Sequence, residues 1–181
     1  MQIFEDIEAW TQNFQEGWLS KLQRTGTFYW DSYILPKNKE TVSGAGVDLS
    51  KSRLMLISSA GGYIPDSQEP FNASSPFGDY SVRKFSTLTS FEEIAYAHEH
   101  YDQTAVKTDP QVLLPLKYLG EMVTEEKIGS LASVVNFMGY QPDVSQGLDE
   151  TIPAILEIAK DEKVDAALLV PSCPICCQSV G

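Results

Sequence analysis

The three cysteines of this sequence lie within five positions of one another, at Cys173, Cys176 and Cys177. A secreted protein held by disulfides would instead spread an even number of cysteines along its chain. Cys173 and Cys176 have the C-x-x-C spacing, and Pro174 between them suits the first position of a helix. At a helix N-terminus, unpaired N–H groups and the helix dipole both favour a thiolate. The spacing therefore predicts Cys173 as a nucleophile and Cys176 as the resolving thiol that closes a disulfide with it.

Both histidines of the chain lie in the segment His98-Glu99-His100-Tyr101-Asp102. Histidine transfers protons at neutral pH, so His98 and His100 are candidate acid–base groups. Asp102 is a candidate for the carboxylate that orients one imidazole, and Tyr101 is a candidate substrate contact. The alternative is structural, because Ser90 opens a Ser-x-x-Glu capping box and the histidines would then only end the helix that begins there.

The same cysteines and histidines admit two further interpretations. Zinc binds thiolates and imidazoles, so Cys173, Cys176, His98 and His100 form an alternative set of zinc ligands. A structural zinc motif would normally show two separated pairs of ligands. Small buried cysteines also pack well, so packing alone is the third interpretation. We favour redox-active or catalytic thiols and expect no bound metal or other cofactor.

A continuous apolar run, Leu-Met-Leu-Ile at residues 54–57, is typical of a strand covered on both faces in a parallel sheet. Ser59, Gly61 and Gly62 follow it, and open α/β sheets bind ligands at the carboxyl ends of their strands. These three residues are therefore candidate substrate contacts, as is Cys177 beside the C-x-x-C pair. A Gly-Gly pair is also a plain turn, and the dinucleotide fingerprint G-x-G-x-x-G is absent.

Strands and helices alternate along the rest of the chain. The patterns predict a long surface loop over residues 65–81, a helix over 112–126, a strand within 131–138, a helix capped by Asp149, and a buried strand over 164–170. The inward-facing residues of the helix after Asp149 are predicted to be Ile152, Ile155, Leu156 and Ala159, with Pro153 in its first turn. This alternation predicts an α/β fold with a doubly wound, mainly parallel sheet of the Rossmann or flavodoxin kind.

Apolar side chains recur every three or four positions near the N-terminus, at Phe4, Ile7, Trp10, Phe14, Trp18 and Leu22. This spacing predicts an amphipathic helix whose aromatic stripe packs in a core or a subunit interface. We expect one α/β domain over residues 1–181, with a helical and aromatic extension over 1–36 and the sheet core from about residue 51. The aromatic stripe and the reactive segment at the C-terminus together predict a homo-oligomer or a hetero-complex, or a chain that continues beyond Gly181.

The composition excludes several classes of function. The 181 residues contain 43% hydrophobic and 21% charged residues, which is ordinary for a globular protein. A net charge of −12 would repel nucleic acids and anionic membranes, so we expect neither as a partner. The sequence has no apolar run of membrane-spanning length and no basic-then-apolar leader at its start. We therefore expect a cytoplasmic protein.

Several segments after residue 54 together resemble the selenoprotein B family of glycine, sarcosine, betaine and D-proline reductases. They are Ser58-Ser59-Ala60-Gly61-Gly62, the histidine segment, Leu114-Pro115-Leu116 leading to Lys127-Ile128-Gly129, Phe137-Met138-Gly139-Tyr140, and Val170-Pro171-Ser172-Cys173-Pro174-Ile175-Cys176. The resemblance implies reductive cleavage of a C–N bond, in which a selenocysteine or cysteine of the last motif attacks carbon. Cys173 matches the selenocysteine position and Cys176 its partner thiol, whereas Cys177 has no obvious counterpart.

The residues and the resemblance together predict a thiol-dependent reductase acting on a small polar substrate, with cleavage of a C–N or C–S bond. The resemblance implies an external dithiol or thioredoxin-type protein as the reductant and a complex with another reductase subunit. The alternative is a non-catalytic or zinc-binding subunit of a larger complex.

Overall fold

The computed structural model describes residues 4–39 and 45–180. The chain divides into two compact units. The smaller contains residues 1–46 and 143–145, and the larger contains residues 47–142 and 146–181. The smaller unit covers the predicted extension over 1–36, and the larger holds the predicted sheet core. The single domain over residues 1–181 stays a prediction.

The smaller unit contains one continuous run of helix, composed of α1 (Ile7–Asn13), a π-helical turn (Phe14–Leu19) and α2 (Ser20–Thr25). The Asp6 carboxylate caps its start by accepting a hydrogen bond from the Ala9 N–H, 3.0 Å away. Gly26 ends it at a left-handed φ of +66°. The predicted stripe forms the core of this unit, because Trp10, Phe14, Trp18 and Leu22 are buried together against Tyr33. The amphipathic helix is confirmed from Ile7 onward, whereas Phe4 lies before it and forms a β-bridge with Asn38.

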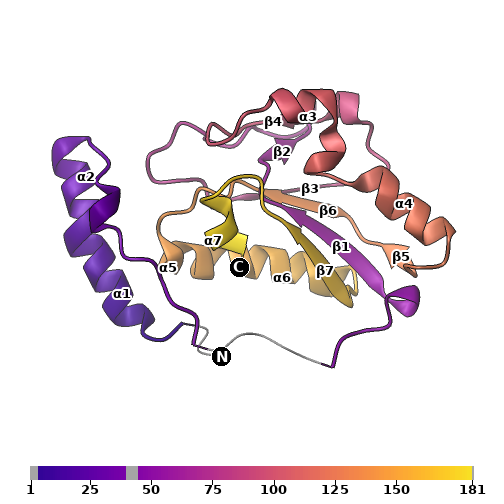
Figure 1. The fold of residues 1–181 in the computed structure, drawn as a ribbon, viewed down its shortest axis with the longest axis horizontal. Helices are drawn as coiled ribbons and strands as arrows, with labels where there is room; N and C mark the ends of the chain where they lie inside the picture. Colours follow the sequence, from indigo (N-terminus) through magenta and orange to yellow (C-terminus); the bar gives the residue numbers. More distant parts are fainter. Residues whose placement is uncertain (1–3, 40–44, 181) are drawn as a thin grey trace. The chain divides into compact units, whose positions relative to one another are not determined.

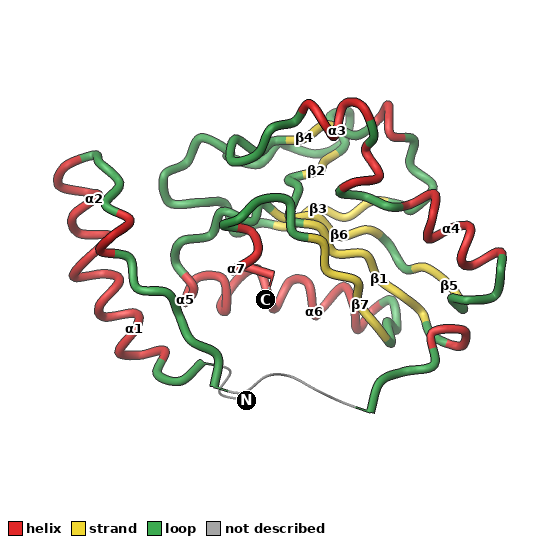
Figure 2. Tube along the Cα trace, in the orientation of Figure 1, coloured by secondary structure: helices red, strands yellow, loops and turns green. Residues whose placement is uncertain are grey.

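A five-stranded sheet forms the centre of the larger unit (Figures 1 and 2). Its strands are β1 (Arg53–Ser58), β3 (Val82–Phe85), β5 (Ser130–Leu131), β6 (Val134–Phe137) and β7 (Ala166–Val170). On one side β1 pairs in parallel with β5 and then β6, and on the other side with β7. β3 pairs antiparallel to β6 at the far edge. The sheet is therefore mostly parallel, as predicted.

Two hydrophobic clusters cover the two faces of β1, which alternate along the strand. Leu54 and Leu56 pack with Leu116 and Leu119 of α4 (Leu116–Thr124). Met55 and Ile57 belong to the other cluster, against which partly buried residues of α6 (Ile152–Asp161) pack. The fold is thus mixed α/β with helices packed on both faces. Its finer classification as a doubly wound sheet stays a prediction.

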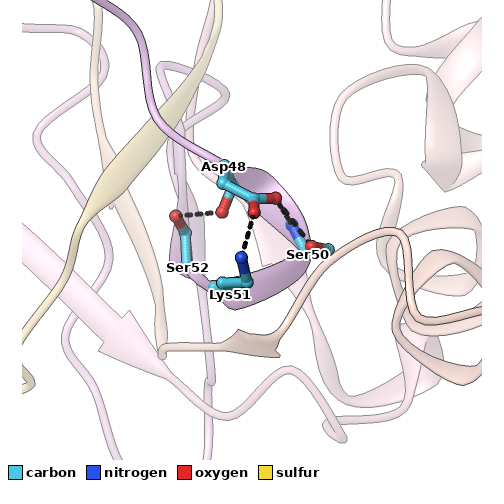
Figure 3. A network of polar contacts seen from close by, with 4 residues as sticks. All are labelled: Asp48, Ser50, Lys51 and Ser52. Carbon is cyan, nitrogen blue, oxygen red and sulfur yellow. Dashed lines mark hydrogen bonds and ion pairs between the residues drawn. The ribbon is translucent and has the colours of Figure 1, made fainter.

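The described residues also form several shorter elements. They are the antiparallel pair β2 (Gly62–Tyr63) and β4 (Ala95–Tyr96), and the helices α3 (Thr104–Thr108), α5 (Val144–Gln146) and α7 (Cys176–Val180). The chain enters β1 through a 3-10 turn (Leu49–Lys51) that a polar network fixes (Figure 3). In this network the Asp48 carboxylate accepts a hydrogen bond from the Ser50 hydroxyl at 2.6 Å and forms an ion pair with Lys51 at 3.0 Å. The Ser52 hydroxyl donates to the Asp48 carbonyl.

Two helices begin at residues other than those predicted from the sequence. Residues 110–112 form a separate 3-10 turn, and the helix proper begins only after Pro115, which cannot continue a preceding helix. Asp149 is not a cap, because the helical run already begins at Val144 and passes through a π-helical turn into α6. Of the four predicted inward-facing residues of α6, Ile155 and Ala159 pack on the core, whereas Ile152 and Leu156 are exposed.

Of two further local predictions, the capping box at Ser90 and the burial of the strand after residue 164, only the first is confirmed. The capping box at Ser90 is confirmed, but it caps only a 3-10 turn (Phe91–Glu93) that β4 follows directly. The histidines therefore do not end a helix that begins at Ser90. The predicted burial of the strand after residue 164 is wrong, because β7 is the edge strand of the sheet and its central residues are exposed. Among the described residues, no helix is long and apolar enough to cross a membrane.

Candidate active site

Four segments of the larger unit meet at the carboxyl edge of the parallel strands. Ser59 follows β1, Gly139 follows β6, and Ser172 opens the segment after β7 that carries the cysteine pair. His98 arrives from β4, whose neighbour Ala97 donates its N–H to the Gly61 carbonyl at 2.9 Å. Parallel strands end at one edge of a sheet, so this topology brings residues over 100 positions apart into contact.

The two cysteines of the C-x-x-C pair are in direct contact. Both are free thiols, and their sulfur atoms lie 2.6 Å apart. The backbone N–H of Cys176 also donates to Cys173 Sγ at 3.2 Å. Helix α7 begins at Cys176, so Cys173 precedes its first turn, but Pro174 lies in a turn before the helix and not at its first position as predicted. Because an S–S bond is about 2.0 Å long, a small side-chain movement would join these sulfurs as a disulfide.

Cys176 is the more deeply enclosed of the two, with no exposed surface, and its sulfur faces hydrogen-bond donors. His98 Nε2 and Ser172 Oγ each lie 3.3 Å from Cys176 Sγ. The backbone N–H of His100 donates to His98 Nδ1 at 3.1 Å, so Nδ1 must be an unprotonated acceptor. In the neutral ring the proton is then on Nε2, and His98 donates to the Cys176 sulfur.

These contacts divide the charge between the two sulfurs. Hydrogen bonds from Cys173, His98 and Ser172 lower the pKa of the Cys176 thiol against the opposing effect of burial. The pKa of Cys173 is raised, first because its thiol donates to Cys176 and second because it is buried. The lowered pKa of Cys176 and the raised pKa of Cys173 favour the negative charge on Cys176, with the Cys173 thiol donating to it.

Gly139 leaves the space that Cys176 occupies. A Cβ added there would lie 2.7 Å from Cys176 Cβ and 2.8 Å from Ser59 Cβ, and it would overlap the Cys176 sulfur. The Ser179 hydroxyl of α7 donates to the Gly139 carbonyl at 2.6 Å, which holds the short helix against this position. Gly139 is a site residue that was not predicted from the sequence. The available signal was a glycine two residues after a buried strand, where the backbone approaches another group closely.

Two serines connect the end of β1 to the cysteine segment. The Ser172 N–H donates to Ser59 Oγ at 2.9 Å, and the Ser172 hydroxyl, whose proton is shared with the Cys176 sulfur, lies 3.0 Å from the Ser59 carbonyl. Ser59 is fully buried. Ser59, which was predicted to contact the substrate, thus contacts the cysteine segment. Ser172 is a second site residue that was not predicted from the sequence.

The other residues of the histidine segment surround His98 in different ways. The Tyr101 ring lies 4.7 Å from the His98 ring, and its hydroxyl donates to the Ala60 carbonyl. The His100 ring packs against Tyr140 at 4.4 Å, and burial lowers its pKa, with a smaller effect of His98. Asp102 is exposed and accepts a hydrogen bond from the Thr104 N–H at the start of α3. The backbone of His100, rather than the Asp102 carboxylate, therefore orients the His98 imidazole.

The Gly61-Gly62 turn is buried inside the protein. Gly61 has a left-handed φ of +68°, and a Cβ there would overlap the Ala97 carbonyl. The Gly62 N–H donates to the Asn136 side-chain oxygen at 3.2 Å. The space that the two glycines leave free is thus occupied by other groups of the protein, the Ala97 carbonyl and the Asn136 side chain. Cys177 is exposed, and its N–H donates to the Cys173 carbonyl.

His98, Cys173 and Cys176 also form a possible metal-ligand set, because their ligand atoms all lie within 4.8 Å of one another. His100, the fourth predicted zinc ligand, is outside this set. Two thiolates on one tetrahedral zinc, each about 2.3 Å from the metal, lie about 3.8 Å apart. The two sulfurs, at 2.6 Å, would have to separate by more than an ångström to bind zinc. Their spacing is closer to that of a disulfide-forming pair than to that of two zinc-bound thiolates.

The fold and this site define a class: an α/β protein with a buried cysteine pair and a histidine at the carboxyl edge of a mostly parallel sheet. Within that class, the chain belongs to the glycine/sarcosine/betaine reductase selenoprotein B family, whose model matches residues 16–172. The resemblance seen in the sequence is confirmed. The match ends directly before Cys173.

Two curated relatives have names of the same kind. The chain is 29% identical to the D-proline reductase subunit gamma of Acetoanaerobium sticklandii over 133 residues, 73% of this chain and 53% of that protein. It is 37% identical to the glycine reductase complex component B subunit gamma of Carboxydothermus hydrogenoformans over 87 residues, 46% of this chain and 20% of that protein. The chain thus spans about half of the first relative and a fifth of the second. No solved structure matches it.

Proposed function

We propose that this chain carries the dithiol site of a thiol-dependent reductase that cleaves a C–N or C–S bond of a small polar substrate. The observation that carries the proposal is the contact of two free sulfurs, 2.6 Å apart, with His98 donating to one of them. Membership of the reductase family and the names of the relatives support a reductive role.

Cys173 is the attacking sulfur in this proposal. It is 6% exposed whereas Cys176 is fully covered, so Cys173 is the one that a substrate reaches first. Cys176, as the resting thiolate, accepts the Cys173 proton when the substrate arrives. The Cys173 thiolate forms an S–C bond and the amine or thiol leaves with that proton. A substrate with a carbonyl group next to the reacting carbon suits this chemistry, because the next step leaves an electron pair on that carbon.

Cys176 then completes the two-electron reduction. Its thiolate attacks Cys173 Sγ, the S–C bond breaks, and the released carbon takes a proton from solvent or from His100. The dithiol has become a disulfide, and the substrate has gained two electrons and two protons. An external dithiol or a thioredoxin-type protein must return the two electrons, which suits a reducing compartment such as the cytoplasm. We also propose that the chain works in a complex with another reductase subunit, as the names of its relatives suggest.

The reversible disulfide is the direct test. The reduced protein would be treated with an oxidised dithiol, then alkylated, and the cysteine peptides would be mapped by mass spectrometry. We expect a Cys173–Cys176 disulfide in the wild type and in the matched control Cys177→Ser, but not in Cys173→Ser. A disulfide that includes Cys177, or three thiols that stay alkylatable, would contradict the proposal. Turnover would then be measured with glycine, sarcosine, betaine and D-proline in the presence of a dithiol.

A second candidate function, a zinc-binding subunit, rests on the ligand set of His98, Cys173 and Cys176. Two thiolates and one imidazole would leave a fourth position open on the metal. Metal analysis of protein purified without added metal decides between the two. Stoichiometric zinc that is lost in Cys173→Ser would replace the redox proposal, whereas metal-free protein that forms the disulfide would exclude this candidate.

A further inference from the structure

The outer edge of the sheet at β7 differs from its centre. Every residue from Leu54 to Ser58 of β1 is buried, whereas in β7 the exposed fractions are 37% for Leu168 and 47% for Leu169. β7 pairs with β1 on its inner side, and no strand among the described residues pairs with its outer side (Figure 1). The last strand of the sheet thus exposes apolar side chains at a free edge.

These two leucines lie on opposite faces of the sheet. Leu168 is in register with Leu56 of β1, whose side chain belongs to the cluster with α4. Leu169 is in register with Ile57, which belongs to the cluster beneath α6. Neighbouring parallel strands point residues in register to the same face. Both faces of the sheet therefore stay open at β7, whereas helices cover both at β1.

The backbone of β7 has groups available for a further strand. The Val170 carbonyl accepts a hydrogen bond from the Ser59 N–H at 3.1 Å, so the polar groups of Val170 face β1. Backbone polar groups alternate in direction along a strand. Leu168 therefore also faces β1, while Ala167 and Leu169 direct their N–H and C=O groups outward. An exposed apolar edge of this kind is a template for pairing with another strand.

The sequence of β7 is complementary to itself in antiparallel orientation. A two-fold axis at Leu168 pairs all five residues of Ala166–Val170: Leu168 faces its own copy, Ala167 faces Leu169, and Ala166 faces Val170. Each alanine thus faces a larger apolar residue. The outward-facing groups of Ala167 and Leu169 form the hydrogen-bonded pairs, and no charged residue lies in the strand.

We propose that β7 is the interface through which a second copy of this chain binds, so that two sheets join antiparallel into one. The self-complementary register supports this occupant, and the strand itself adds no charge repulsion. Each copy carries a net charge of −12, and an interface between identical chains must keep like charges apart, which an uncharged strand does. The exposed Ile152 and Leu156 of α6, one helical turn apart, add apolar surface in the segment that leads into β7.

The first test is the mass in solution of the full chain, measured by light scattering after size exclusion from about 1 to about 100 μM. We expect the wild type to reach twice 20.1 kDa and Leu169→Lys to stay monomeric, because a lysine there would face the small Ala167 at the apolar edge. The matched control is Leu88→Lys in an exposed loop, where the leucine is 92% exposed, and this variant should still dimerise. A monomeric wild type over this range, or a Leu169→Lys dimer, would overturn the proposal.

The second test fixes the register and does not depend on how well the lysine variant folds. In the proposed pairing the two copies of residue 168 form a non-hydrogen-bonded pair with Cα atoms about 4.5 Å apart, within the span of a disulfide. Oxidation of Leu168→Cys should give a covalent dimer that peptide mapping assigns to residue 168. Leu169→Cys should not give one through residue 169, because its two copies are offset by about 7 Å along the strands, which places their Cα atoms about 8 Å apart and beyond the span of a disulfide. A link at 169 but not at 168, or no covalent dimer, would contradict this interface.

Discussion

His98 connects the cysteine pair to the rest of the larger unit through both of its ring nitrogens. Nδ1 accepts the N–H of His100, and Nε2 is left to donate to Cys176. The contact to Nδ1 comes from backbone, so it does not depend on which side chain residue 100 carries. The two histidines therefore have separable roles: the His98 ring stabilises the thiolate, whereas the His100 ring packs against Tyr140 and is only a candidate proton donor.

His98→Ala should raise the pKa of Cys176, because it removes one of the donors that stabilise the thiolate. One lost hydrogen bond to a charged group corresponds to a shift of about one pH unit. The thiolate would then be protonated at higher pH than in the wild type, which an ultraviolet titration of thiolate absorbance follows.

His100→Ala is the matched control, since it keeps the backbone N–H to residue 98 and removes only the ring beside Tyr140. Its thiolate titration should stay close to that of the wild type. Equal shifts in both variants would show that the His98 ring has no special role in stabilising the charge.

Gly139→Ala should destabilise the protein by about 1–3 kcal/mol, because the added methyl group overlaps Cys176 in a packed site. It should also slow formation of the Cys173–Cys176 disulfide, since Cys176 has to move. Thermal unfolding and the rate of disulfide formation measure the two effects.

Gly120→Ala in α4 is the control for glycine replacement, because nothing lies within 4 Å of a Cβ at that position. An alanine in an open helical position should stabilise by about 0.5–1 kcal/mol. If Gly139→Ala were stabilising as well, the close fit of Cys176 against Gly139 would be wrong.

The residues of the site were predictable to different extents. Cys173, Cys176 and His98 could be chosen from the sequence because thiols and imidazoles are rare and carry chemistry by their type. Gly139 and Ser172 act through the shape and the backbone that they offer, which their residue types do not reveal. The sequence also could not separate His98 from His100, since only the local backbone determines which ring faces the sulfurs.

At the scale of elements, Glu162 joins the C-terminus of α6 to the sheet. Its carboxylate accepts the Ser133 N–H at 2.8 Å and forms ion pairs with Lys84 at 3.4 Å and Arg53 at 3.9 Å. Burial opposes its ionisation, but the bonds from Ser133 and Lys84 outweigh burial and lower the pKa of Glu162. This carboxylate therefore stabilises the fold only while it is charged.

Glu162→Gln should lower the free energy of unfolding at neutral pH by about 1 kcal/mol. A lowered native pKa means that the stabilisation is complete above the unfolded value near 4.5 and is lost as the pH falls through the native value. The difference between wild type and variant should thus shrink in acid. Denaturant unfolding at neutral and acidic pH measures it, with the exposed Glu157→Gln as control. A difference that grows in acid would contradict the assigned charge.

The burial of an element was predicted correctly where an apolar sequence is in fact covered by other elements. The apolar run at β1 was assigned correctly because helices cover both of its faces. The run at β7 is equally apolar, but composition does not tell a central strand from an edge strand, so its exposure was missed. The start of α6 was missed for a related reason. Asp149 suits a helix cap, but the upstream residues extend the helical run to Val144.

At the scale of the whole molecule, the candidate site and the aromatic residues of the N-terminal helix belong to different units. His98 and Ser172, which lie within hydrogen-bond distance of the Cys176 sulfur, belong to the larger unit, whereas Trp10, Trp18 and Trp30, the only tryptophans in the sequence, lie in the smaller one. Tryptophan fluorescence therefore reports on the smaller unit, and thiolate absorbance reports on the larger one.

Trp18→Ala should separate the two signals. Trp18 is buried between Phe14, Trp30 and Tyr33, so its removal leaves a cavity that costs about 3–5 kcal/mol. The fluorescence transition of the two remaining tryptophans should move to lower denaturant, while the thiolate titration of Cys176 should not change. Trp30→Ala removes a half-exposed ring from the same cluster and should move the fluorescence transition much less. If Trp18→Ala shifted the Cys176 titration as far as His98→Ala does, the thiolate would depend on the smaller unit as well as on its own contacts.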